Sequence, residues 1–165
     1  MKDEKGFSLI ELLIVVAVIG ILAALAIPNM LRSRQAANEA SAIATVRTVG
    51  TAQATYQTTR GKGKDFAADL TTLQAEGTVD GAVGAGKKSG FTFTCAGTAS
   101  TTAGAQSFFD VSAAPNATGN FGTGNRWLYS NETYVLYNSA TSAITVPAGP
   151  GTRVPVAPAD VAPIQ

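Results

Sequence analysis

The stretch that decides the fold reads GFSLIELLIVVAVIGILAALAIP over residues 6–28. Between Phe7 and Ile27 only Ser8, Glu11 and Gly20 are not plainly apolar. Because an α-helix rises about 1.5 Å per residue, this run spans roughly 31 Å, which matches the hydrocarbon core of a bilayer. The composition therefore predicts a helix that crosses a membrane.

Glu11 is the feature that a simple membrane anchor does not explain. A carboxylate in a spanning helix costs about 2.5–3.5 kcal/mol at the bilayer centre and somewhat less near an end. Such a residue usually has a partner and a task, so we expect Glu11 to be functional.

The N-terminal stretch resembles the signature of type IV pilins and type II secretion pseudopilins. The resemblance is carried by the Gly6/Phe7 junction, Glu11 five residues into the sequence after that junction, Gly20 within the apolar run, and Pro28 just past it. It covers about residues 1–60. It implies a leader peptide, residues 1–6, that a prepilin peptidase removes, followed by N-methylation of the new first residue, Phe7.

The same resemblance implies how the subunit assembles. It implies a helical homopolymer in which Glu11 pairs with the Phe7 amine of an adjacent subunit. It also implies an inner-membrane assembly platform as partner, a lipid bilayer around residues 7–28 before assembly, and an extracellular or periplasmic filament afterwards. Gly20 and Pro28 would form a weak zone that kinks or unwinds on leaving the bilayer, although both residues also occur in ordinary spanning helices.

Two other interpretations of the N-terminus stay open. Ala24-Leu25-Ala26 offers a signal-peptidase site whose use would release a soluble protein starting at Ile27. The chain could also be an uncleaved single-span anchor for a binding protein. Positive charges flank the span on both sides, so they do not decide its orientation in the membrane. The placement of the head outside the cytoplasm is implied by the resemblance to pilins.

Composition excludes several classes of function. The chain of 165 residues has no His, which excludes His-based catalysis and His metal ligands. Its single cysteine, Cys95, excludes an internal disulfide and multi-cysteine zinc sites, and should be a small buried hydrophobe. A net charge of +1 does not indicate nucleic acid as a partner. We find no catalytic constellation and predict no enzyme activity, cofactor or metal.

Residues 29–60 continue the helix with an amphipathic pattern. One face carries residues at helical spacing, namely Ala42, Ile43, Val46, Val49, Gln53 and Tyr56. Arg47, Thr51 and Thr55 lie away from this face. The pattern predicts one helix from Phe7 to Thr59, whose second half docks on a globular head.

Residues 61–146 should form the connection and an antiparallel β head. We expect a short helix from about Leu70 to Gly77, with a Gly-rich loop up to Gly90. The expected strands are Phe91–Cys95, Gln106–Ala113, Arg126–Ser130 and Thr133–Asn138, with Ala143–Val146 as a possible edge strand. Residues 147–165 hold five of the seven prolines and are predicted to be an extended, flexible tail that adds little buried area.

The sequence therefore predicts an α+β pilin fold with a structural function by polymerisation. The first hypothesis is a type IV pilus subunit that serves adhesion, motility or DNA uptake. The alternative is a major pseudopilin of type II secretion, a group in which a calcium loop lies near the C-terminus. Residues 139–165 offer only one acid for such a loop, Asp160, which disfavours this alternative.

Overall fold

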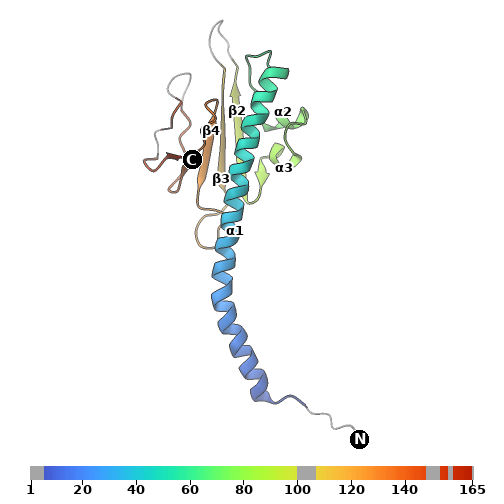
Figure 1. Ribbon diagram of the computed structural model, residues 1–165, viewed down its shortest axis with the longest axis vertical. Coiled ribbons are helices and arrows are strands. Elements are labelled where there is room, and N and C mark those ends of the chain that lie inside the picture. Colours follow the sequence, from blue (N-terminus) through green and yellow to red (C-terminus); the bar gives the residue numbers. More distant parts are fainter. Residues whose placement is uncertain (1–5, 100–106, 148–152, 156–157, 165) are drawn as a thin grey trace.

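The chain folds as one long helix whose upper half lies on an antiparallel sheet (Figure 1). The computed structural model describes residues 6–99, 107–147, 153–155 and 158–164. Helix α1 runs from Leu9 to Thr59, 51 residues, and is continuous through Pro28. The predicted α+β class, with a long N-terminal helix on a small β head, is confirmed.

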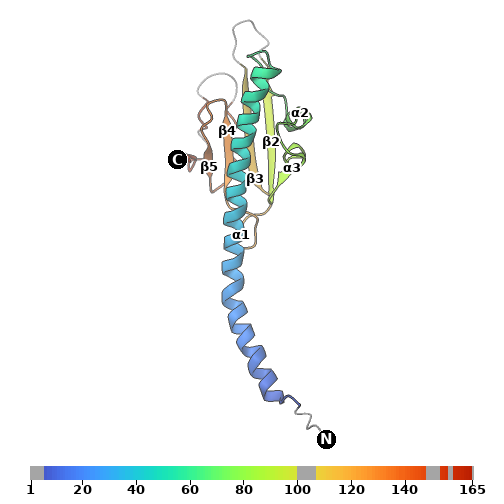
Figure 2. The same cartoon turned by 45° about the vertical axis from the view of Figure 1, so that its right-hand side comes forward.

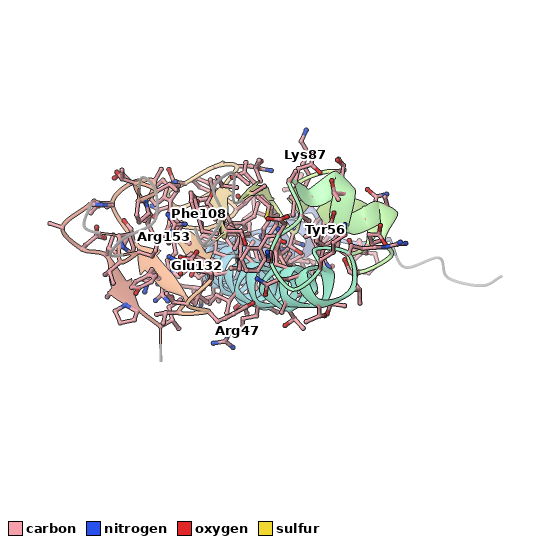
Figure 3. The ribbon with its side chains drawn as sticks, turned by 90° about the horizontal axis from the view of Figure 1, so that it is seen from above. Arg47, Tyr56, Lys87, Phe108, Glu132 and Arg153 are labelled. Carbon is pink, nitrogen blue, oxygen red and sulfur yellow. The ribbon has the colours of Figure 1, made fainter. Side chains whose placement is uncertain are left out.

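The second half of α1 packs across strands β3 and β4, as Figure 2 shows. Its buried residues are Gln35, Ala42, Thr45, Val46, Val49, Gly50, Ala52 and Gln53. Ile43 and Tyr56 are partly buried against the same core. The predicted docking face is therefore confirmed, and Arg47 on the opposite side points away from the head (Figure 3).

The sheet is a meander of six strands in sequence order. Its strands are β1 (Lys87–Lys88), β2 (Phe91–Thr98), β3 (Phe108–Pro115), β4 (Trp127–Asn131), β5 (Tyr137–Ser139) and β6 (Ala162–Pro163). Each pairs antiparallel with the next, and the long β2–β3 ladder runs from Phe91 opposite Pro115 to Thr98 opposite Phe108. The predicted antiparallel meander is confirmed.

The connection from α1 to the sheet contains more structure than predicted. The expected short helix is α2 (Leu70–Ala75), capped by Asp69, whose carboxylate accepts a hydrogen bond from the Thr72 amide at 2.7 Å. Hydrogen bonds from Thr71 and Thr72 lower the pKa of Asp69. The stretch expected to be a loop also holds α3 (Gly81–Gly84) and β1. Asp80 caps α3 in the same way, by accepting a hydrogen bond from the Val83 amide.

Two strand predictions near the C-terminus are wrong. Residues 143–146 form no strand, and the edge is β6, paired with β5. The strand expected from Thr133 starts only at Tyr137, because the Asn131 side chain accepts hydrogen bonds from the Thr133 amide and hydroxyl and turns the chain. Tyr134 completes this turn with a φ of 59°.

The face of α1 from Ala42 to Tyr56, predicted to dock on the head, includes the buried side-chain amide of Gln53, and this amide has hydrogen-bond partners. Gln53 is 0% exposed and bonds both backbone groups of Ala67, donating to the carbonyl at 3.0 Å and accepting from the amide at 2.8 Å. Its side chain ties the end of α1 to the connection that follows, since buried polar groups need such partners. The same Nε2 atom lies 3.1 Å from Cys95 Sγ.

Cys95 is half-buried, and burial raises its pKa to about 11. Since the thiolate is the reactive species, a rise of about two units from the ordinary value leaves about 100-fold less thiolate at pH 8. A thiolate of higher pKa is also a stronger nucleophile, so we expect the folded chain to react with iodoacetamide at pH 8 at least about tenfold more slowly than the urea-unfolded chain. Mass spectrometry of timed samples would measure the alkylation rate of Cys95, and equal rates in the folded and unfolded chains would contradict the raised pKa.

The described residues of the C-terminal segment contradict the prediction that it adds little buried area. Arg153 and Pro155 are buried, and Ile164 packs against the main core. The reason lies in β4, which is buried on both faces of the sheet. Leu128 faces the core under α1, while Tyr129 on the opposite face belongs to a second cluster with Val161. This second face needs a cover, and the C-terminal segment provides it. Residues 148–152, 156–157 and 165 of the predicted tail lie outside the described residues.

Arg153 attaches this segment to the sheet. Its Nε donates to Glu132 Oε1 at 2.8 Å, its Nη2 donates to Asp110 Oδ1 at 2.5 Å, and its Nη1 donates to the Pro147 carbonyl at 2.7 Å. The guanidinium also lies over the Phe108 ring, 4.5 Å from the ring centre. Figure 3 shows Arg153, Phe108 and Glu132 on one side of the head. We call Arg153, Asp110 and Glu132 the arginine cluster.

With a single cysteine the head has no internal disulfide, and the arginine cluster adds charged hydrogen bonds to its apolar packing. Tyr129 extends the arginine cluster, because its hydroxyl donates to Asp110 at 2.5 Å. Burial, and then this hydrogen bond, raises the pKa of Tyr129. The head is therefore also held by charged hydrogen bonds between segments far apart in the sequence.

Candidate assembly interface

The first half of α1 projects from the head as a bare apolar helix (Figures 1 and 2). Among the described residues, one helix is long and apolar enough to cross a membrane by length and composition, and none of its most apolar 18-residue stretch is buried. We call residues Leu9–Ile27 the apolar rod. Soluble monomers rarely expose an apolar patch larger than a few hundred Å². The apolar rod therefore needs a cover from lipid or from another protein chain.

Glu11 and Phe7 lie at the free end of the apolar rod. Glu11 Oε2 accepts a hydrogen bond from the Ser8 backbone amide at 2.8 Å, which caps the first turn of α1. Phe7 precedes this cap and is 90% exposed. The structure thus brings Glu11 to the helix start, within one turn of the Gly6/Phe7 junction, with nothing from the head covering either residue.

Gly20 and Pro28 both lie within continuous helix. A Cβ built on Gly20 would meet no neighbouring atom within 4 Å, so packing inside this subunit does not require a glycine there. Pro28 has no amide hydrogen and cannot donate to the carbonyl of Ala24. Both residues weaken the helix locally, and the kink stays a prediction because the structure holds the segment in its helical form.

A groove runs beside the upper end of the apolar rod. It is lined by Ala23, Ala24, Ile27, Pro28, Leu31, Arg32, Gln35, Asn120, Phe121 and Asn125, and it encloses about 610 Å³. One wall is α1, and the other is the loop of residues 116–126 between β3 and β4, which we call the β3–β4 loop. Phe121 on this loop is 84% exposed.

Sequence reasoning missed the β3–β4 loop as part of the site. The only signal was a lone aromatic, Phe121, in a stretch rich in Gly and Asn. Glu39 of α1, near the lower end of the head, also contacts this loop. Its carboxylate accepts from the Asn125 amide at 2.8 Å and lies 3.5 Å from Arg126, so its partners are within the chain.

Asp160 is the residue that a C-terminal calcium loop would have to use. Its carboxylate accepts hydrogen bonds from the Ser139 hydroxyl, the Ala140 and Thr141 amides, and the Thr141 hydroxyl. These donors lower its pKa and occupy the lone pairs that a cation would need. In the described part of the chain no three acidic or cysteine side chains gather into a possible metal site. The residues present therefore do not fit a calcium loop.

The comparison with protein families matches the N-terminus. Residues 1–27 match the family described as "Prokaryotic N-terminal methylation motif". This stretch contains the Gly6/Phe7 junction, Glu11 and the whole of the apolar rod. No solved structure matches the chain significantly.

Curated relatives include pilus and secretion proteins. The chain is 41% identical over 67 residues to the type IV major pilin protein PilA of Myxococcus xanthus, which covers 41% of this chain and 30% of that protein. It is 62% identical over 39 residues to the type IV wide pilus major component PilA4 of Thermus thermophilus, covering 24% and 30%. It is 37% identical over 43 residues to the type II secretion system core protein G of Vibrio cholerae, covering 26% and 30%.

The fold and these matches define a class: α+β proteins with an N-terminal methylation motif on an exposed apolar helix. They support assignment of this chain to the type IV pilin and pseudopilin family. The chain spans about 30% of the length of the three relatives named, so the resemblance to them is local.

Proposed function

We propose that this chain is a structural pilin subunit that polymerises into a type IV pilus-like filament. The observation that carries the proposal is the apolar rod, which has no buried residue while the other half of the same helix is docked on a head. A rod of this kind is stable in a bilayer or in the core of a bundle of identical rods. The names of the relatives, which include major pilins, support the same function.

The rod serves two states of the subunit in turn. Before assembly it anchors the subunit in the inner membrane with a single span, and the head lies outside the cytoplasm. After assembly the rods of neighbouring subunits replace lipid as the cover. Because the described residues of the head contain no candidate metal cluster and the site is a bare helix, we propose a structural and not a catalytic role.

Glu11 controls the register of the polymer in this proposal. Once the leader is removed, Phe7 carries a free ammonium group within one helical turn of Glu11. In the filament, the Glu11 carboxylate pairs with the Phe7 ammonium of an adjacent subunit. A subunit placed at the wrong height would leave two unpaired charges in an apolar core, at a cost of several kcal/mol.

Processing requires partners in the membrane. A prepilin peptidase cleaves after Gly6 and methylates Phe7, and an inner-membrane assembly platform extracts the subunit. Gly20 and Pro28 let the helix bend or unwind during this extraction. The match of residues 1–27 to the N-terminal methylation motif supports the first of these steps.

A type II secretion pseudopilin is the second candidate, supported by the similarity to core protein G. The occupied carboxylate of Asp160 argues against it, because the one acid that a calcium loop could use there already accepts four hydrogen bonds within the chain. Electron microscopy of cells that express the chain at its native level would separate the two. Long surface filaments labelled by an antibody against the head support the pilus, whereas secretion that fails without the chain, in cells lacking filaments, supports the pseudopilin.

The processing step has a direct test. Mass spectrometry of the mature protein is expected to find Phe7 as the first residue with one added methyl group. In the Gly6→Leu variant we expect the leader to stay attached, because a side chain at this position would crowd the peptidase cleft. A mature protein that begins at Met1 or at Ile27 would show that the chain is an ordinary anchor or a secreted protein.

A further inference from the structure

The groove beside the apolar rod has a fixed outer wall. Gln35 Nε2 donates to the carbonyls of Gly119 and Gly122 at 2.6 and 3.1 Å, and Asn38 donates to the Thr123 carbonyl at 3.0 Å. Gln35 is itself buried. Together with Glu39, these side chains tie the β3–β4 loop to α1 over slightly more than one helical turn. The loop is therefore attached to the helix at several points, and the groove exists before anything binds.

Phe121 lies on this wall and is largely uncovered by the described residues of its own head. It is a large aromatic side chain with 84% of its surface exposed, and it faces the groove together with Ala23, Ala24 and Ile27 of α1. An exposed aromatic next to an apolar groove is the usual composition of an interface core. The groove thus extends the apolar surface of the rod upward onto the head.

The floor of the groove suits a second helix. Ala23 and Ala24 are small, and Gly20 lies one turn below them with open space where a side chain would be. Small residues on a helix surface allow a second helix to approach closely. The occupant that this shape fits is a rod and not a globular surface.

The geometry points to the groove as the docking site for the apolar rod of a second copy of this chain, with Phe121 packed against that rod. This inference rests on the proposed polymerisation and adds a contact between the head and a neighbour's rod. The groove begins at Ala23 and Ile27, which belong to the rod, so it is continuous with the surface that polymerisation covers. The second copy must be displaced along the helix axis by roughly 17 Å, about 11 residues, to bring the middle of its rod to the middle of the groove.

A lipid chain fits the groove less well than a helix does. The run from Phe7 to Ile27 already spans roughly the full hydrocarbon thickness, so the groove beyond Pro28 lies outside the bilayer core. The upper lining includes Arg32, Asn120 and Asn125, which are polar. A rigid helix from a displaced neighbour can pass along both the apolar and the polar part of the groove.

Photo-crosslinking from position 121 tests this contact. The probe is p-benzoylphenylalanine in place of Phe121 in the full chain, in filaments mixed from this unlabelled variant and ¹⁵N-labelled wild type. After irradiation we expect a dimer in which the light probe peptide is joined to a heavy peptide from residues 7–32. The isotope pair separates this adduct from one within the same chain. The same probe at Tyr134, a half-exposed aromatic at the far end of the head, should give no adduct with residues 7–32 of another copy.

Two substitutions provide a second measurement. Phe121→Asp is expected to reduce the yield of sheared filaments at least tenfold, because a charge would face an apolar rod, whereas Phe121→Leu should keep most of the yield. Both variants should leave the melting temperature of the head unchanged, since Phe121 makes few contacts in its own chain. Adducts with phospholipid or only with residues of the same chain, or wild-type yield from Phe121→Asp, would overturn the inference. If wild-type cells form no filaments at all, the proposed function fails instead.

Discussion

Replacing Arg153 with methionine is expected to lower the free energy of unfolding of the head by about 3–5 kcal/mol, the usual cost of removing one partner from a buried ion pair. Arg153 is 5% exposed at its side chain, and the two carboxylates it contacts, Asp110 and Glu132, are 12% and 24% exposed. Methionine retains an apolar stem over Phe108 but leaves both acids without their cation. Glu132 Oε2 is buried without a hydrogen-bond partner among the described residues, and the substitution would also take Arg153 away from Oε1.

Urea unfolding of the full chain in detergent, followed by circular dichroism, would measure this loss. Because α1 contributes much of the helical signal, the near-ultraviolet signal of Trp127 and the tyrosines is the better probe of the head. The control is the triple variant Arg153→Met, Asp110→Asn, Glu132→Gln, which removes the charges together and should recover part of the lost stability. A loss below about 1 kcal/mol for Arg153→Met would mean that the arginine cluster is only a surface contact.

Truncation after Val146 removes the same arginine and uncovers the outer face of β4. We therefore expect the truncated chain to be at least as unstable as Arg153→Met, because it also loses Ile164 from the main core and Val161 from the cluster around Tyr129. This reverses the expectation from the sequence that the head folds without residues 147–165. An unchanged melting temperature for the truncated chain would restore that expectation.

Replacing Glu11 with valine is expected to abolish filaments made from that variant alone while leaving the subunit in the membrane. The substitution removes the charge that we propose pairs with a neighbour's Phe7 ammonium. Insertion should be at least as efficient as in wild type, because valine is favoured in a spanning helix where a carboxylate costs about 2.5–3.5 kcal/mol. The leader should still be removed, since the Gly6/Phe7 junction is unchanged.

The structure supplies a control for this experiment. Glu11 also caps its own helix by accepting from the Ser8 amide, and this contact is worth about 1 kcal/mol. Glu11→Gln keeps an oxygen that can accept from Ser8 but removes the charge. If the charge pair is what matters, both variants lose filaments in a shearing assay while a membrane blot shows normal amounts. Normal filaments from Glu11→Gln alone would reduce the role of Glu11 to capping, and normal filaments from Glu11→Val would exclude any assembly role.

Most of the fold was predictable because its signals are local. The apolar run up to Ile27, the helical spacing of Ala42, Val46 and Val49, and the aromatic alternation from Phe91 each report the environment of their own segment. Strands that follow one another at short spacing predict a meander, and the sheet has that order. Capping by Asp69 is likewise a contact between residues three apart.

The errors occur where one segment covers another that is distant in the sequence. Trp127-Leu128-Tyr129 places large side chains on both faces of β4, and this was a sign that the outer face needs a cover. Nothing in the proline-rich composition of residues 147–165 identified that segment as the cover. A short edge strand such as β6 has no hydrophobic alternation of its own and forms only because β5 offers free backbone groups.

The sequence by itself determined that this protein has a bare apolar helix with one acid near its start, because hydrophobicity and charge are properties of single residues in a continuous helix. Only the tertiary structure decided what surrounds that helix. Arg153 meets Asp110 across 43 positions, and Gln35 holds the β3–β4 loop across more than 80. These contacts depend on how the sheet folds back on α1, and each pairs side chains or backbone groups whose own local sequence carries no sign of the partner.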